Sequence, residues 1–226
     1  MDHKAHQQEW TTEASDQLFE YGYEGTVGWL QNLGHKKIYQ WLKKSSNGIF
    51  LDLGIGQGSQ FIDPEFSPEG LLRSDLSLHN LLIYKKHHPE FKLLALNAET
   101  LPIKSNSIDH VLSIYMLEHI PDLEGSLREI HRVLHDNGNF FIALPTEGGF
   151  LYKLGRELTT KRYVERNFDI DYDEVIKAHH LHNYPEIEAL VKARFEIKKI
   201  QYLPFTFLPT YHLNAFVCLL ARKSIE

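Results

Sequence analysis

Apolar residues occur along this chain in two kinds of run, which alternate. Residues 49–53 are continuously apolar up to an acidic position, a pattern typical of a strand that is buried on both faces of a parallel sheet. Residues 26–44 instead repeat apolar positions at helical spacing and predict a helix. Further strands are predicted at residues 71–74, 91–96, 195–202 and 213–221, and further helices after Ser77, Pro121 and Tyr184.

Strands that alternate with helices indicate an α/β protein with a parallel sheet and right-handed crossovers. The last two predicted strands are an exception, because only the short turn at residues 205–211 separates them. A turn this short cannot return the chain for parallel pairing, so we expect these two strands to form an antiparallel hairpin.

Glycines follow the first strand at every second position, in the segment IFLDLGIGQGS. Gly54, Gly56 and Gly58 allow a tight reversal and leave no side chain between the backbone and a ligand, although a purely structural turn is the alternative. A dinucleotide fingerprint would have its third glycine at position 59, where this chain has Ser59. Asp52 suits a positively charged ligand group such as the ammonium of an amino acid. The sequence therefore predicts a nucleotide-like cofactor at the carboxyl end of this strand.

The pattern acid-x-Gly-x-Gly-x-Gly resembles the cofactor loop of class I S-adenosylmethionine-dependent methyltransferases. Residues 106–145 resemble the fourth strand, a helix and the fifth strand of the same family, with a break at 136–138 before a strand at 140–144. The resemblance covers residues 49–145. It implies a Rossmann-like, seven-stranded, mostly parallel sheet with helices on both faces, whose antiparallel last strand inserts between its predecessor and the fifth strand.

The resemblance also implies cofactor-binding residues beyond the glycine loop. Asp75, at the end of the second strand, would bind the ribose hydroxyls with both carboxylate oxygens; capping of the following helix is the alternative. The other positions are Leu76, then Asn97, Ala98 and Glu99 beside the adenine, and Tyr115 near the methionine end. The expected cofactor is S-adenosylmethionine, and the expected reaction is in-line transfer of its methyl group to an O or N atom of a small molecule.

One domain is expected for the whole chain, 1–226, with four parts: an N-terminal helical cap (1–45), the cofactor-binding core (46–145), a substrate-lid insertion (146–186), and the final helix and hairpin (187–226). The insertion is long for a simple crossover; a helical hairpin with solvated charges is its alternative. The first helix of the core departs from the family, because Pro64 and Pro68 must shorten or break it.

The candidate catalytic residues are His119, His182 and Glu147, each a possible proton acceptor beside the methyl acceptor, with His180 as the alternative to His182. His119 has a structural alternative, as a loop anchor. No metal site is expected: His131 and His135 lack the glutamate of a zinc-protease helix, and the neighbouring histidines at 179–182 rarely point at one ion. A faint likeness of residues 169–187 to methyltransferases of polysaccharide or secondary-metabolite pathways favours a sugar or secondary metabolite as acceptor.

Composition and charge limit the possible partners and the compartment of the protein. The 226 residues are 42% hydrophobic, enough for a packed core, and the formal net charge of −6 without a long basic run disfavours nucleic acid as partner. The single cysteine, Cys218, excludes an internal disulfide and suits a reducing compartment. The first ten residues lack a signal-peptide core, and residues 203–221 make a poor membrane span. We therefore expect a cytoplasmic protein without a membrane partner; monomer and dimer both stay open.

Two other functions stay open from the sequence. The chain can be a non-catalytic S-adenosylmethionine-binding or scaffold protein that keeps the cofactor loop without transferring methyl groups. It can also be a nicotinamide-dependent oxidoreductase, although the glycine spacing speaks against that class.

Overall fold

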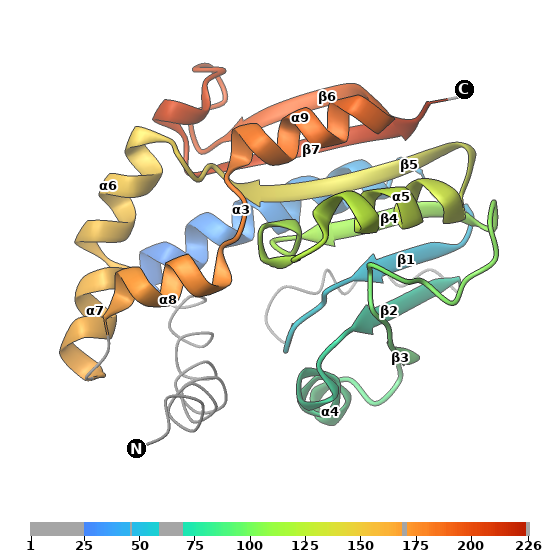
Figure 1. Cartoon of the computed structure of the whole chain (residues 1–226), viewed down its shortest axis with the longest axis horizontal. Coiled ribbons are helices and arrows are strands. Elements are labelled where there is room, and N and C mark those ends of the chain that lie inside the picture. The colour runs from blue at the N-terminus through green and yellow to red at the C-terminus, as the bar shows by residue number, and fades with distance from the viewer. Residues whose placement is uncertain (1–24, 46, 59–69, 169–170, 225–226) are drawn as a thin grey trace.

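The computed structural model describes residues 25–45, 47–58, 70–168 and 171–224. Its centre is one seven-stranded sheet in the order β3-β2-β1-β4-β5-β7-β6 (Figure 1). The strands are β1 (Phe50–Leu53), β2 (Leu71–Asp75), β3 (Leu93–Ala95), β4 (Ile108–Ile114), β5 (Leu134–Pro145), β6 (Phe195–Leu203) and β7 (Phe216–Lys223). This architecture confirms the expected Rossmann-like, mostly parallel sheet.

The antiparallel strand lies where the sequence places it. Strands β1 to β5 pair in parallel, whereas β7 is antiparallel to both β5 and β6 and lies between them. β6 and β7 therefore form the predicted hairpin. The largest difference in a boundary lies in β5, which begins at Leu134 rather than at Phe140; the expected break at 136–138 is a bulge within the strand, where Asn137 adopts φ 63°.

Helices cover both faces of the sheet. α5 (Leu123–Val133) and α9 (Tyr184–Arg194) lie in front of it in Figure 1, and α3 (Gly25–Leu42) lies behind it. Each face has its own apolar core, with Leu127 and Val191 in the first and Ile38 and Leu42 in the second. α4 (Leu78–His87) packs beside β2 and β3 and begins at the N-cap Ser77. β strands that are apolar on both faces require this double cover.

The insertion between β5 and α9 folds as three short helices, α6 (Phe150–Leu158), α7 (Thr160–Asn167) and α8 (Tyr172–His179). They stand beyond the carboxyl end of β5, at one end of the molecule (Figure 1). Whether they act as a lid stays a prediction. The proline-containing segment and most of the N-terminal cap, residues 59–69 and 1–24, lie outside the described residues.

None of the helices in the described part of the chain combines the length and the apolar character that a membrane span requires.

Candidate cofactor and transfer site

A cavity of about 370 Å³ opens at the carboxyl edge of the sheet, beside the ends of β1, β2 and β4 and the loop after β3. It is the place where parallel α/β sheets bind ligands. Most of the expected cofactor residues line it: Gly54, Gly56, Asp75, Leu76, Asn97, Ala98, Glu99 and Tyr115. His119 also lines it, whereas Asp52 and Gly58 do not.

The three glycines of the loop all need the left-handed backbone that glycine adopts without strain, with φ values of 70° at Gly54, 56° at Gly56 and 48° at Gly58. Two of them are also sites of close packing. A Cβ at Gly54 would lie 2.2 Å from Met116 Cγ, and one at Gly58 would lie 2.6 Å from a ring carbon of Tyr84. The tight turn predicted for this loop is therefore confirmed. Close packing against Met116 and Tyr84 is a second reason for glycine at positions 54 and 58.

Asp75 ties the glycine loop to the start of α4. Its Oδ2 accepts a hydrogen bond from Gly56 N–H at 2.8 Å, and its Oδ1 accepts from Ser77 N–H at 2.8 Å and from the Asn80 side-chain amide at 3.3 Å. A carboxylate offers about four acceptor positions. One position, on Oδ2, is left for a ribose hydroxyl, so the geometry favours one oxygen rather than both.

Asp52 lies behind the cavity wall and is only 8% exposed. Its register partner on β2 is Arg73, which is itself 1% exposed and stacks over the Phe91 ring at 4.0 Å. Burial raises the pKa of Asp52 to about 6, and the positive charge of Arg73 opposes that rise. The contact of Asp52 with a ligand ammonium stays a prediction.

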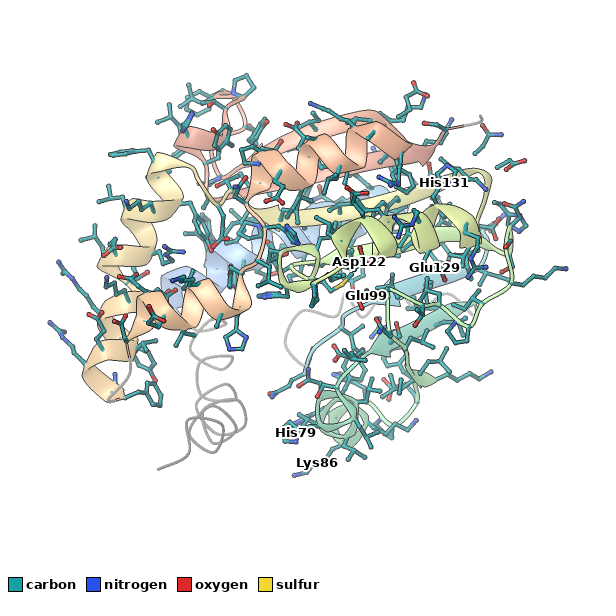
Figure 2. All side chains as sticks on the ribbon, viewed as in Figure 1. His79, Lys86, Glu99, Asp122, Glu129 and His131 are labelled. Carbon is teal, nitrogen blue, oxygen red and sulfur yellow. The ribbon has the colours of Figure 1, made fainter. Side chains whose placement is uncertain are left out.

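The loop after β3 is held by side chains that face α5. Asn97 Oδ1 accepts from Glu99 N–H at 2.9 Å, and Glu99 Oε1 accepts from Asp122 N–H at 2.8 Å (Figure 2). Glu129, on α5, accepts from Leu101 N–H at 2.8 Å, in the region that Figure 2 shows next to Glu99. This side of the cavity is therefore preorganised by hydrogen bonds within the protein.

Tyr115 closes the cavity toward α3. It adopts φ 56°, and its hydroxyl donates to the Gln31 carbonyl at 2.9 Å. Its ring lies 5.1 Å from the Phe216 ring. These contacts fix the side chain in place, because non-glycine residues rarely adopt a positive φ without support.

Five ionisable side chains meet next to this end of the cavity, and we call them the acid–histidine cluster: Glu118, His119, Glu147, Arg156 and His180. Glu147 Oε1 lies 2.8 Å from His180 Nδ1 and 3.3 Å from Arg156 Nη1. The His119 and His180 rings meet edge to face with their centres 4.7 Å apart. The cluster joins three segments that are distant in the sequence: the turn after β4, the turn after β5, and the insertion.

The sequence did not single out Glu118 or Arg156, and it offered His180 only beside His182. Glu118 neighbours a candidate histidine but follows no known catalytic spacing. Arg156 lies in a segment whose charged residues are equally consistent with a helix face exposed to solvent.

His119 is the member of the cluster that reaches the cavity. Its Nδ1 donates to the His179 carbonyl at 2.8 Å, which makes Nε2 the acceptor nitrogen of the neutral ring. Desolvation, aided by the positive charge of His180, lowers the pKa of His119 to about 4. The imidazole is therefore neutral at pH 7.

The other two candidate catalytic residues lie differently. His182 lies 2.8 Å from Glu186 Oε1 through Nδ1 and 3.0 Å from the Ile120 carbonyl through Nε2, so both ring nitrogens are used within the fold. Glu147 is 8% exposed and pairs inside the cluster. Neither lines the cavity, so the geometry supports only His119 as a residue in contact with an acceptor.

Within the described ranges, no group of three or more His, Cys, Asp or Glu side chains is arranged to hold a metal ion. His131 (Figure 2) has a structural environment instead: its ring lies 5.5 Å from the Phe195 ring, and its Nε2 lies 3.3 Å from the Ser224 carbonyl.

Comparison with known proteins identifies the central part of the chain. Residues 51–142, from β1 into β5, match the family model of a methyltransferase domain. This region is a methyltransferase domain, and the fold of the chain is that of S-adenosylmethionine-dependent methyltransferases. The cofactor of the family is S-adenosylmethionine. The cavity fits it, because a glycine loop, an acid after β2 and a small apolar wall all lie at one edge.

The methyltransferase domain is similar to several characterised proteins. It is 36% identical over 107 residues to arginine-hydroxylase NDUFAF5 of Danio rerio, covering 46% of this chain and 33% of that protein. It is 30% identical over 120 residues to demethylmenaquinone methyltransferase of Streptomyces avermitilis, covering 50% and 51%. The chain thus spans between a third and about half of these relatives.

A solved structure shares the fold over nearly the whole chain. It is a methyltransferase from Thermotoga maritima described as a possible histamine N-methyltransferase, with a TM-score of 0.62, 21% identity, and coverage of 98% of this chain and 96% of that chain. Sequence identity at this level shows the fold alone.

Proposed function

We propose that this protein is a methyltransferase that transfers the methyl group of S-adenosylmethionine to an O or N atom of a small molecule. The observation that carries the proposal is the position of His119, with Nε2 as its acceptor nitrogen, at the end of a cavity built for that cofactor. A methyl group on a sulfonium is already an activated electrophile. The protein therefore contributes chiefly alignment, which can supply roughly 7–11 kcal/mol of a barrier.

Each cofactor residue has a proposed role. Gly54 and Gly56 let the backbone approach the cofactor, and Asp75 accepts a ribose hydroxyl through Oδ2. Asp52 supplies negative charge toward the amino-acid ammonium, directly or through water. Asn97, Ala98 and Glu99 border the adenine, and Leu76 and Tyr115 border the ribose and the methionine end.

His119 takes the proton that an O or N acceptor releases. Its Nδ1–H is held by the His179 carbonyl, so only Nε2 can accept. Glu147 and Arg156 hold His180 against His119 and so fix the ring. His182 anchors the insertion to the Ile120 carbonyl and takes no part in proton transfer.

The acceptor class rests on the insertion and on the relatives. Relatives carry names that refer to methylation of demethylmenaquinone, sterols and juvenile hormone acid, and these are different small molecules. We propose a small-molecule acceptor, with a sugar hydroxyl or a secondary metabolite as first choices. Residues 146–186 would form its lid. A cytoplasmic location and the absence of a nucleic-acid partner remain predictions from composition.

A thermal-shift assay with four compounds tests the cofactor assignment. We expect S-adenosylmethionine and S-adenosylhomocysteine to raise the melting temperature, and NAD⁺ and NADP⁺ to leave it unchanged. Asp52→Ala should reduce the response while the unliganded protein stays folded. A response to the nicotinamide compounds alone would refute the assignment.

Transfer itself is tested with radiolabelled methyl donor and a panel of hydroxyl and amine acceptors. We expect label in at least one acceptor and none with His119→Gln. Cofactor uptake without transfer to any acceptor of the panel would favour a non-catalytic binding protein.

A further inference from the structure

Glu118 is a buried carboxyl next to His119 that the proposed transfer step does not use. Glu118 is 2% exposed, and its Oε2 has no hydrogen-bond partner among the residues that the structure describes. Its Oε1 lies 3.9 Å from His119 Nε2. A buried carboxylate without partners is costly, so such a group either holds a proton or neighbours a cation. Glu118 is placed to neighbour a charged His119 and then to hold its proton.

The charged and titratable groups around Glu118 come from four segments. His119 follows it on the turn Leu117–His119, His180 reaches it from the end of α8, Glu147 from the turn after β5, and Tyr152 from α6. Burial, opposed by His180 and reinforced by Glu147, raises the pKa of Glu118 to about 7. Near neutral pH this carboxyl is therefore close to its midpoint.

The backbone around the pair is fixed. The Glu118 carbonyl accepts from Leu181 N–H at 2.8 Å, and His119 Nδ1 donates to the His179 carbonyl at 2.8 Å. The segment 179–181 therefore holds both residues of the pair at once. His119 cannot turn Nε2 away from Glu118 without breaking its bond to His179.

We propose that Glu118 and His119 accept the proton of the methyl acceptor as a pair, with Glu118 as the residue that stabilises and then relieves the charged imidazole. This inference rests on the proposed function. Its geometric basis is the 3.9 Å separation of Oε1 and Nε2, within ion-pair distance, together with the hydrogen bond that fixes Nδ1.

The proton balance is simple. The acceptor X–H bond breaks with its electrons on X, and the proton goes to His119 Nε2. The X–C bond forms as the C–S bond of the sulfonium breaks, with that electron pair left on sulfur. The imidazolium then faces ionised Glu118, which takes the proton and later loses it to solvent. Without Glu118, the imidazolium would form beside His180, and the remaining carboxylate of the cluster would be Glu147, which already pairs with His180 and Arg156.

Nuclear magnetic resonance of ¹⁵N-histidine-labelled protein tests the pair without an acceptor. The protein is saturated with S-adenosylhomocysteine and titrated from about pH 5 to pH 9, and the His119 signals are assigned from their loss in His119→Gln. We expect Nε2 of His119 to stay unprotonated yet to show an inflection near pH 7, from ionisation of Glu118. In Glu118→Gln this inflection should be absent.

Glu186→Gln is the matched control. Glu186 Oε1 lies 2.8 Å from His182 Nδ1, so this variant should move the His182 signals and leave the His119 inflection in place. If Glu118→Gln does not fold, Glu118→Asp replaces it, and the inflection should then move to another pH. An unchanged inflection in the Glu118 variant, or a proton resident on His119 Nε2, would overturn the pair.

Failure of the proposed function would look different. In that case wild-type protein would not take up S-adenosylhomocysteine, or His119→Gln would transfer methyl groups normally, whatever the titration of Glu118 shows.

Discussion

The carboxylate of Asp75 accepts a hydrogen bond of 2.8 Å from the backbone N–H of Gly56. The acid at the end of β2 therefore supports the cofactor loop as well as facing the cavity. Its other oxygen accepts from Ser77 N–H, which leads into α4. One side chain thus couples the loop after β1 to the helix after β2, and a change at this position should affect both binding and local structure.

Asp75→Asn tests this double role. An amide has one acceptor oxygen, so its NH₂ group must face either Gly56 N–H or Ser77 N–H, and one donor is left unpaired. We expect the Kd for S-adenosylhomocysteine, measured by calorimetry, to rise about 10- to 150-fold, corresponding to about 1.5–3 kcal/mol. Asp136→Asn is the control, because that side chain is 68% exposed and pairs only with Lys223 among the described contacts. Equal affinities for the two variants would contradict the role of Asp75.

Gly54→Ala should destabilise the protein and abolish cofactor binding. The backbone there has φ 70°, and the new Cβ would lie 2.2 Å from Met116 Cγ. Left-handed backbone alone costs a non-glycine residue about 1–2 kcal/mol, and the clash adds to that. The free energy of unfolding, measured by denaturant titration, should fall by more than about 1 kcal/mol.

Gly155→Ala is the matched control for that experiment. It lies inside α6, and a Cβ there would meet nothing within 4 Å. Alanine is favoured over glycine in a helix by up to about 1 kcal/mol, so this variant should be as stable as wild type or more stable. If both alanine variants lost the same stability, local strain at Gly54 would not be the cause.

The sheet and the cofactor loop could be predicted from the sequence because their signals are local. The apolar run at 49–53, the spaced glycines, and the acids within β1 and at the end of β2 each lie within a few residues. The structure also confirms the place of the last strand, between β5 and β6, that the family resemblance implies. The β5 boundary was the weaker prediction. A bulge at Asn137 lets the strand continue through a segment whose composition is typical of a turn.

The acid–histidine cluster could not be predicted in the same way. It brings together Glu118, Glu147 and His180, each about thirty residues from the next in the sequence. Residues 179–181, at the end of α8, bond to the turn after β4 and make them neighbours. The histidines at 179–182 drew attention as a metal or base motif. In the structure their bonds instead attach the insertion to residues 118–120.

Gly34 and Tyr115 should show energetic coupling. A Cβ at Gly34 would lie 2.0 Å from the Tyr115 hydroxyl oxygen, which the Gln31 carbonyl holds in place. We expect Gly34→Ala to destabilise the protein by about 1–3 kcal/mol through overpacking of α3 on the sheet. Tyr115→Phe removes the hydroxyl, at a cost of about 1 kcal/mol for its hydrogen bond.

The double variant distinguishes this clash from a general loss of helix packing. Gly34→Ala with Tyr115→Phe should be more stable than the sum of the two single changes predicts, by about 0.5 kcal/mol or more in a double-mutant cycle. Recovery should be incomplete, because the ring carbon of Tyr115 would still lie 3.0 Å from the new Cβ. Strictly additive effects would place the strain elsewhere.

Cofactor binding should depend on pH through Asp52. Burial raises the pKa of this carboxyl to about 6, so its charge is present above pH 6 and lost below it. A ligand ammonium interacts favourably only with the ionised form. Calorimetry between about pH 5 and pH 8 should therefore show affinity for S-adenosylhomocysteine increasing as the pH rises through about 6. Asp52→Asn should bind more weakly, without that step.

Stability should follow the opposite trend. The folded-state pKa of Asp52 lies above the ordinary aspartate value of 3.8, so its contribution to stability is fully present below about pH 4 and is lost as the pH rises through about 6. Asp52→Asn should remove this part of the pH dependence of unfolding.

Arg73→Met tests whether Asp52 controls the pH dependence of cofactor binding. Loss of the buried cation should raise the pKa of Asp52 further, so the rise in cofactor affinity should move to higher pH. A binding step that stays at the same pH in Arg73→Met would mean that a group other than Asp52 controls cofactor affinity.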